Sequence, residues 1–371
     1  MLVLGIETSC DETAASVVEN GILIRSNVIS SQIALHQQHG GVVPELAARA
    51  QLTAIMPVIE QALADAAVTL SDIDLIAFTQ GPGLAGSLLV GVNTAKTLSY
   101  VRGIPMIGIN HLEAHVYANW LQDSNETAQP GPTFPAICLL VSGGHTDLML
   151  LHDHQTYESL GHTIDDAAGE AFDKGARLLG LDYPGGPAIQ RAANAGRPDA
   201  YRFPRAWLGD SWNFSFSGLK TALLREVDLF RLPSSPRAAS TLPFPKHFPP
   251  TFGDDAPIED LAASYQQAIV DVLARKTALA ARDKGVGSVL IAGGVAANAL
   301  LRGRLRDELV LAFKDAVPPL LHWPELSLCT DNAAMIAGLG YQRYQAGYRT
   351  GLDADAYPRW PIGRFPPGQE P

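Results

Sequence analysis

Cysteine is scarce in this chain of 371 residues, and its three cysteines, Cys10, Cys138 and Cys329, stand far apart. Small secreted domains that depend on disulfides carry even numbers of closely spaced cysteines. We therefore expect no disulfide framework and a reducing compartment, the cytoplasm. The residues from Leu2 onward read as a strand without a basic lead, so we also expect no signal peptide.

Long apolar runs and an excess of positive charge are also missing. No hydrophobic stretch is long enough to cross a bilayer, so we expect no membrane partner. Lysine and arginine total 27 against 38 aspartates and glutamates, a net charge of −11. Because general affinity for nucleic acids depends on cations that neutralise phosphates, this composition argues against diffuse binding but leaves room for a local basic face. The length suits two domains, each with its own core.

A nucleotide-binding P-loop is absent as well. The strand expected over Leu75 to Thr79 leads into the glycine-rich stretch from Gln80 to Ser87 and then into a helix. A strand followed by such a loop and a helix N-terminus can bind an anion. The stretch lacks the Lys-Ser/Thr ending of a P-loop, and tight packing of strand against helix explains the glycines equally well.

What the chain does contain is a histidine pair that indicates a metal. His111 and His115 stand four residues apart, directly after the apolar run Ile104 to Ile109, in a segment expected to be helical to about Leu121. On a helix such a spacing brings both imidazoles to one face. Glu113 lies roughly 200° around the helix from His111 and points away, so the base of a zinc protease is missing. The pair could equally be two helix histidines without a ligand.

Two other histidine pairs compete for a ligand role. His36 and His39 stand one helical turn apart if their segment is helical, and His152 and His154 share a face if theirs is a strand. Both pairs lie in polar stretches that we expect to be exposed, so we assign neither to a metal.

The strand pattern repeats in the two halves of the chain. Each half begins with a strand, a polar turn and a second strand, and later has a strand that runs into glycines and a helix. The hairpin turns are Glu7–Thr13 and Ser142–Asp147, and the later strands are Leu75–Thr79 and Ser288–Ala292, the latter followed by Gly293–Asn298. This repetition predicts a duplicated α/β unit with a cleft between the halves, where the loops at the carboxyl ends of the strands gather.

The remaining segments complete a coarse outline. Pro44 is well placed in the first turn of a helix that extends to about Ala66, and Tyr183–Pro187 reads as a turn. On a helix over 165–174, Asp166, Glu170, Asp173 and Lys174 can share one face, which we interpret as solvated. The final helix is expected to begin near Thr330, with Thr330 as its N-cap and Asp331 as a favourable first-turn charge.

Eight motifs in one order resemble a known family. They are Gly5-Ile6-Glu7-Thr8-Ser9-Cys10-Asp11-Glu12-Thr13, His39-Gly40-Gly41-Val42-Val43-Pro44-Glu45, the His111/His115 pair, Val141-Ser142-Gly143-Gly144-His145-Thr146, Gly169-Glu170-Ala171-Phe172-Asp173-Lys174, Tyr183-Pro184-Gly185-Gly186-Pro187, Phe214-Ser215-Phe216-Ser217-Gly218-Leu219-Lys220 and Gly293-Gly294-Val295-Ala296-Ala297-Asn298. Together they resemble the bacterial TsaD family of tRNA adenosine threonylcarbamoyltransferases. The resemblance extends from Leu2 to about Gly347.

The resemblance implies the two-lobed fold of the actin, hexokinase and Hsp70 superfamily and a definite reaction. A threonylcarbamoyl group passes from threonylcarbamoyl-AMP to N6 of the adenosine beside the anticodon, position 37, in tRNAs that read codons beginning with A. It implies one iron ion per subunit, or zinc, bound by His111, His115 and Asp331. The residues implied to hold the adenylate are Leu140, Val141, Ser142, Gly143, Gly144, Asp173, Gly186 and Asn298. Asp11 or Glu12 could take the amine proton or orient the metal's surroundings.

Partner proteins follow from the same resemblance: TsaB, TsaE and an adenylate-making enzyme of the TsaC type, with tRNA as substrate. Arg191, Arg197, Arg202, Arg205 and Lys220 cluster in sequence and are candidates for tRNA contact, although each singly could be scattered surface charge. An actin-like ATPase, a sugar kinase or a non-catalytic structural partner is the alternative function.

We expect one lobe over residues 1–135, a second over 136–347 and a tail over 348–371, with a proline-rich surface insertion at 232–257. Two features depart from the family pattern. Gln51 stands where a histidine is often found, which leaves the role of its helix open, and the insertion looks longer than usual, so no function carries over there.

Overall fold

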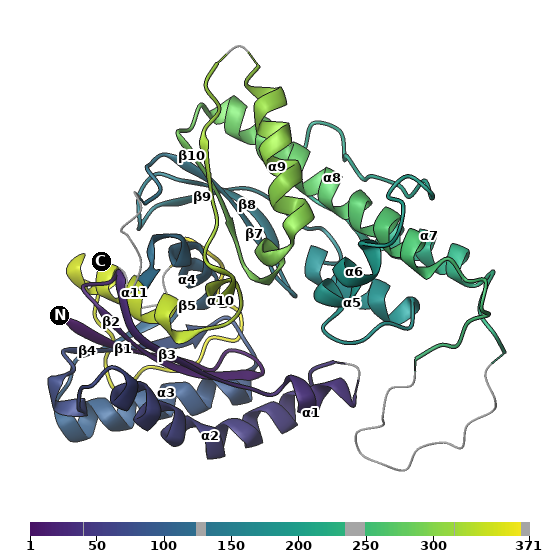
Figure 1. The fold of residues 1–371 in the computed structure, drawn as a ribbon. Helices are drawn as coiled ribbons and strands as arrows, with labels where there is room; N and C mark the ends of the chain where they lie inside the picture. Colours follow the sequence, from purple (N-terminus) through teal and green to yellow (C-terminus); the bar gives the residue numbers. More distant parts are fainter. Residues whose placement is uncertain (40, 124–130, 234–248, 315, 365–371) are drawn as a thin grey trace.

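The computed structural model describes residues 1–39, 41–123, 131–233, 249–314 and 316–364. Two mixed sheets form the two lobes of the molecule, and a short helix lies between them (Figure 1). Within the described residues, no helix combines the length and apolar character needed to span a membrane.

The first sheet has the strand order β5-β4-β1-β2-β3-β6. Its strands are β1 (Leu2–Glu7), β2 (Glu12–Glu19), β3 (Leu23–Ser31), β4 (Leu75–Gly81), β5 (Met106–Asn110) and β6 (Gln122–Asp123). The first three form an antiparallel meander, and β4 and β5 continue the sheet in parallel from β1. Every residue of β4 is buried because helices cover both faces, which explains its continuous apolar run.

The second sheet has the order β11-β10-β7-β8-β9. Its strands are β7 (Ala136–Val141), β8 (Thr146–Leu151), β9 (Tyr157–His162), β10 (Ser288–Ala292) and β11 (Leu320–His322). Again three strands form an antiparallel meander, and the next two join in parallel from the first of them. The five strands repeat the topology of β1 to β5, which confirms the duplicated two-lobed fold.

Helices cover the sheets and connect them. The first lobe has α1 (Ile33–Gln37), α2 (Pro44–Asp65), η1 (Leu70–Asp72) and α3 (Ala85–Arg102), followed by α4 (His111–Tyr117) and η2 (Ala118–Trp120). The second has α5 (Ala168–Leu178), α6 (Gly185–Ala193), α7 (Ser217–Val227), α8 (Ile258–Lys284), η3 (Gly294–Ala297), α9 (Ala299–Ala312) and α10 (Leu326–Cys329). α2 and α3 lie together along one face of the first sheet (Figure 1).

The last helix, α11 (Ala333–Gln345), returns to the first lobe and packs against β1, β2 and β4. The domain division predicted from the sequence assigns these residues to the second lobe instead. The close approach depends on Gly5 and Gly340, since a Cβ at Gly5 would lie 2.2 Å from the Ala333 carbonyl oxygen and one at Gly340 would lie 2.4 Å from the Ala77 Cβ. The described part of the tail follows α11 onto the same lobe, where the Tyr357 amide donates to the Gln80 carbonyl at 2.8 Å.

Three local expectations were wrong. α5 begins at Ala168, so Asp165 and Asp166 precede the helix, and α6 begins at Gly185, inside the stretch read as a turn. His36, which was expected to be exposed, is fully buried. Its Nδ1 accepts the Val43 amide at 3.2 Å, and its Nε2 lies 3.3 Å from the Gln32 side chain. Residues 234–248 of the proline-rich insertion lie outside the described residues. The two described ends of the insertion meet where the Leu232 amide donates to the Thr251 carbonyl at 2.9 Å.

We predict that Gly5→Ala lowers the free energy of unfolding by about 1–3 kcal/mol, because the added methyl forces α11 away from β1. Denaturant unfolding followed by circular dichroism measures this change. Gly303→Ala in the middle of α9 is the matched control, since a Cβ there meets nothing within 4 Å, and stability should stay equal or rise by up to about 1 kcal/mol. Equal stability of the Gly5 variant and the native chain would show that the contact is not tight.

Candidate metal centre and substrate cleft

α4 begins immediately after β5, and a side-chain cap fixes that junction. The Asn110 side-chain oxygen accepts the amides of Leu112 at 2.9 Å and Glu113 at 3.3 Å, which satisfies two of the free N–H groups of the first turn. His111 is thus the first helical residue and His115 lies one turn further. Their rings meet edge to face with centroids 4.6 Å apart, so the predicted common face is confirmed.

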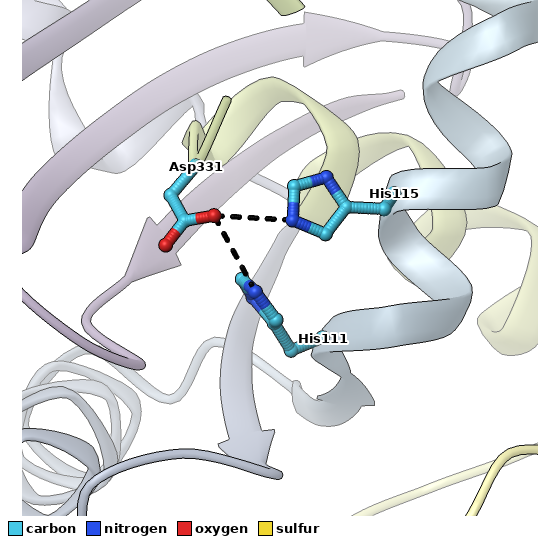
Figure 2. A group of neighbouring side chains, drawn as sticks. All are labelled: His111, His115 and Asp331. Carbon is cyan, nitrogen blue, oxygen red and sulfur yellow. Dashed lines mark hydrogen bonds and ion pairs between the residues drawn. The ribbon is translucent and has the colours of Figure 1, made fainter. Parts of the chain in front are cut away.

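Asp331, which directly precedes the N-cap of α11, meets the two imidazoles (Figure 2). Its Oδ1 lies 3.1 Å from His115 Nε2 and 3.5 Å from His111 Nε2. Ligand atoms about 2.1 Å from one metal ion lie roughly 3.0–3.4 Å from each other. The three side chains therefore fit a single metal ion, and two imidazoles with one carboxylate are a ligand set that iron or zinc accepts.

Glu7 at the end of β1 orients His111. Its side chain is fully buried, and its Oε2 lies 3.0 Å from His111 Nδ1 while accepting the Thr79 hydroxyl at 2.5 Å. A hydrogen bond from Nδ1 to a carboxylate fixes the tautomer and leaves Nε2 as the ligand atom. Burial lowers the pKa of His111, but Glu7 and Asp331 outweigh it and raise the pKa to about 10, so the surroundings favour positive charge. Glu7 is not among the site residues predicted from the sequence, although an acid that ends an apolar strand is a signal for such a role.

Glu113 points away from the metal ligands, as predicted. Its carboxylate is buried and pairs with Arg343 of α11 at 2.6 Å, and its other oxygen accepts the Gly363 amide at 2.8 Å. A buried carboxylate with these partners holds α4, α11 and the tail together. It is not available as the base of a protease.

Asp11 lies in the turn between β1 and β2, Glu12 begins β2, and α2 and α3 hold this segment in place. The Gln51 side chain donates to the carbonyls of Cys10 at 3.0 Å and Glu12 at 3.1 Å, and the Ser87 hydroxyl donates to Cys10 at 3.0 Å. The structure therefore gives Gln51 a structural part in this turn. Burial raises the pKa of Asp11 and that of Glu12, the latter to about 7, and the Glu12 carboxylate accepts the Ser31 hydroxyl at 2.8 Å.

Glycines of the second lobe border open space. A Cβ on Gly143, Gly144, Gly186 or Gly294 would meet nothing within 4 Å, so a ligand can approach their backbone. Ser142 closes this loop because its amide donates to the His145 carbonyl at 2.9 Å. Gly293 differs, since its φ of +84° and a Cβ position 2.5 Å from the Val141 carbonyl oxygen require glycine for packing.

The other residues implied to hold the adenylate have structural partners. Leu140 and Val141 are fully buried in β7, so only their backbone can face a ligand. Asp173 is in α5, and its carboxylate accepts the amide of Gly185, the first residue of α6, at 2.7 Å. The Asn298 oxygen caps α9 by accepting the Leu301 amide at 3.0 Å, and its NH₂ group donates to Gln266 at 2.9 Å.

The position of Asp331 shows that the predicted start of the last helix was wrong. The N-cap of α11 is Asn332, whose side chain accepts the Met335 amide at 3.1 Å, and the helix begins at Ala333. Thr330 is therefore not the cap, and Asp331 is not a first-turn charge. Its carboxylate is turned to the histidines instead, a long-range contact that local helix rules do not contain.

Two of the proposed tRNA-contacting cations are engaged with carboxylates. Arg197 pairs with Asp260 at 2.8 Å and Arg205 pairs with Asp271 at 2.9 Å. The Phe214–Lys220 motif is held by Asp165, whose carboxylate accepts the hydroxyls of Ser215 at 2.5 Å and Ser217 at 2.8 Å. The stronger candidates for tRNA contact are therefore the other three cations of this set, Arg191, Arg202 and Lys220.

The two repeated sheets define a protein of the actin, hexokinase and Hsp70 superfamily. The three-ligand group between them is a candidate metal site at the lobe junction. The sequence profile described as TsaD, tRNA N6-adenosine threonylcarbamoyltransferase, matches residues 23–338. The chain is 56% identical over 362 residues to the tRNA N6-adenosine threonylcarbamoyltransferase of Thermomicrobium roseum, covering 98% of this chain and 97% of that protein. It is 47% identical over 359 residues to that of Bacillus subtilis, covering 96% and 95%. The chain belongs to the TsaD family.

Solved structures show the same fold at low identity. The HypF structure from T. kodakarensis is similar with a TM-score of 0.56 and 16% identity, over 93% of this chain and 48% of that one. A nucleotide-bound full-length HypF gives a TM-score of 0.54 and 12% identity, over 93% and 46%. These likenesses concern the fold alone, and the alternative of an ATPase, sugar kinase or structural partner is not favoured by the full-length relatives.

We predict that His111→Ala and Asp331→Ala each lose bound metal while the fold persists, because each removes a ligand from a packed core. Glu7→Gln should keep the metal but bind it about 10–100-fold more weakly, since it disturbs the tautomer of His111. Elemental analysis and metal titration measure these effects. His152→Ala is the control, because that histidine is exposed and lies 3.5 Å from Glu158. Native metal content in either alanine variant of a ligand would contradict the assignment.

We also predict that Gly144→Val and Gly294→Val weaken binding of a threonylcarbamoyl-AMP analogue far more than they lower the melting temperature, because their Cβ positions face open space. Gly293→Val is the matched control and should lower the melting temperature, since its backbone requires glycine. Calorimetric titration and thermal unfolding provide the two readouts. If Gly294→Val destabilised the chain as much as Gly293→Val, Gly294 would have a packing role.

Proposed function

We propose that this chain transfers the threonylcarbamoyl group of threonylcarbamoyl-AMP to N6 of adenosine 37 in tRNAs that read codons beginning with A, and that it does so as a metal-dependent acyltransferase. The observation that carries the proposal is the convergence of His111, His115 and Asp331, with Glu7 behind His111, at the junction of the two lobes of a TsaD-family chain.

The metal is one iron ion per subunit, with zinc as the alternative, held by His111, His115 and Asp331. When bound there, a divalent metal supplies a Lewis acid for an oxygen of the adenylate. The residues present fit it, because three ligand atoms of suitable type lie within 4.8 Å of one another and Glu7 orients one of them.

The open loops of the second lobe bind the adenylate. Backbone amides near Gly144 and Gly294 can approach a phosphate without adding a group that titrates. Asp173 and Asn298 keep the starts of α6 and α9 in place around the same cleft. Holding the carbamoyl carbon in a fixed position matters because the exocyclic amine of adenine is a weak nucleophile.

Asp11 and Glu12 face this chemistry from the first lobe. A pKa of about 7 suits Glu12 as a proton acceptor at neutral pH, and Gln51 and Ser31 hold its backbone carbonyl and its carboxylate in place. The Asp11 carboxylate repels those of Asp331 and Asp173, so the three acids together favour a bound cation, which supports a role for Asp11 in orienting the surroundings of the metal.

Partner proteins and the tRNA complete the proposed system, which operates in the cytoplasm. The partners are TsaB, TsaE and an adenylate-making enzyme of the TsaC type. With a net charge of −11 the chain cannot attract tRNA diffusely, so contact depends on local cations such as Arg191, Arg202 and Lys220.

We predict weak and steeply salt-dependent tRNA binding by the isolated chain and useful turnover only when the partners are added. Nucleoside mass spectrometry of unmodified tRNA incubated with threonylcarbamoyl-AMP measures the product, with and without partners and at two salt concentrations. Rapid, salt-insensitive modification by the chain alone would overturn the proposed division of labour. No modification by the complete system would overturn the function itself.

A further inference from the structure

A cavity of about 610 Å³ has Leu112, the residue after His111, in its wall and is not explained by the adenylate loops. It is bounded by the loop after β4, by β8 and β9 of the second lobe, and by the tail from Pro358 onward. Cavities of roughly 300–1,000 Å³ with a few polar groups are typical of small-ligand sites.

We infer that this cavity receives the acceptor adenosine, extruded from the tRNA loop, with Asp147 accepting a hydrogen bond from its exocyclic amine. The inference rests on the proposed function and assigns the acceptor subsite within it. Enzymes that modify a base must take it out of its stack and hold it in a pocket, so a separate pocket next to the reacting centre is required.

The inner end of the cavity reaches the metal ligands through short contacts. Gly83, in the cavity wall, lies so close to Ser9 that a Cβ would approach the Ser9 carbonyl oxygen to 2.4 Å. The Ser9 hydroxyl is in turn 3.5 Å from His111 Nε2. From the other lobe, His145 lines the cavity and interacts electrostatically with His111 and His115. A ligand in the cavity therefore lies next to the metal ligands.

The cavity is separate from the adenylate loops. Gly144, Asp173, Gly186, Gly294 and Asn298 do not line it. The loop from Ser142 to His145 lies between the two regions, because its glycines border open space and its His145 lines the cavity. A donor held by the glycines and an acceptor in the cavity would thus meet at this loop, near His111.

The walls suit a purine nucleoside. Leu112 and Met149 provide a buried apolar floor, and Asp147, Ser159 and His162 provide polar groups along β8 and β9. Asp147 and His162 are direct cross-strand partners. Burial raises the pKa of Asp147 to about 6, with His162 opposing the shift, and the carboxylate oxygens can accept hydrogen bonds.

A carboxylate in the cavity suits the amino group of adenine. The amine at C6 can donate a hydrogen bond to Asp147, whereas a purine with hydrogen at C6 offers no such donor. At the rim, Arg359 lines the cavity with an exposed side chain and can contact a backbone phosphate.

Transfer of the threonylcarbamoyl group to an adenosine in this cavity needs no further reagent. The N6–C bond to the carbamoyl carbon forms, the bond from that carbon to the phosphate oxygen breaks, and AMP leaves with the electron pair. The proton lost by N6 passes to a carboxylate of the cleft. Asp147 binds the amine in the ground state and acts as a specificity residue.

The test measures the KM of the reconstituted system for an anticodon stem-loop. Asp147→Ala should raise this KM at least about tenfold, the effect of one lost charged hydrogen bond, while the affinity for a threonylcarbamoyl-AMP analogue stays within twofold. Ser159→Trp fills the cavity and should abolish transfer with the same analogue affinity. Glu158→Gln is the matched control, because it removes a carboxylate on β9 that does not line the cavity.

A competition assay separates recognition from structural damage. A stem-loop with purine riboside at the target position, which lacks the exocyclic amine, should inhibit the native system at least about tenfold more weakly than one with adenosine, and Asp147→Ala should remove that difference. A KM within twofold of native in both cavity variants would overturn the inference, as would loss of analogue binding in Ser159→Trp, which would assign the cavity to the adenylate. Absence of tRNA modification by the native system would contradict the proposed function instead.

Discussion

The lobe junction depends on two carboxylates and two imidazoles that come from three separate parts of the chain. Glu7 ends a strand of the first sheet, His111 and His115 begin α4, and Asp331 precedes α11. A fully buried carboxylate on one side of His111 and a half-buried one in front of both rings are costly unless opposite charge is present. A cation in this position satisfies that requirement, and the surrounding fold keeps the four side chains in register.

The fold explains how such distant residues meet. α11 leaves the second lobe and packs across β1, where Gly5 allows a helix carbonyl to approach the strand. The same crossing places Asp331 over α4. The buried pair of Glu113 and Arg343 then fixes α4 to α11 at 2.6 Å, on the opposite side of α4 from the metal ligands. This pair thus fixes one side of α4, and the other side, which carries the metal ligands, faces the cleft.

Sequence reasoning recovered what depends on local pattern. The strands at Leu2, Leu75 and Ala136, the shared face of His111 and His115, and the outward direction of Glu113 all follow from periodicity. It failed where a distant contact overrides a local preference. Thr330 has the chemistry of an N-cap, but the helix begins three residues later because Asn332 makes the cap. His36 lies in a polar stretch, yet it is fully buried. Asp331 is predicted as a ligand only through the resemblance, and the orienting role of Glu7 follows only from its contact with His111 in the fold.

The order of the ligands along the chain has a consequence for biosynthesis. The two histidines emerge from the ribosome early, whereas Asp331 follows almost the whole second lobe. A nascent or truncated chain that ends before Asp331 offers only the histidine pair, and α11 is then absent from β1. A metal site that needs all three side chains can therefore form only after residue 331 has been synthesised and α11 has packed onto the first lobe.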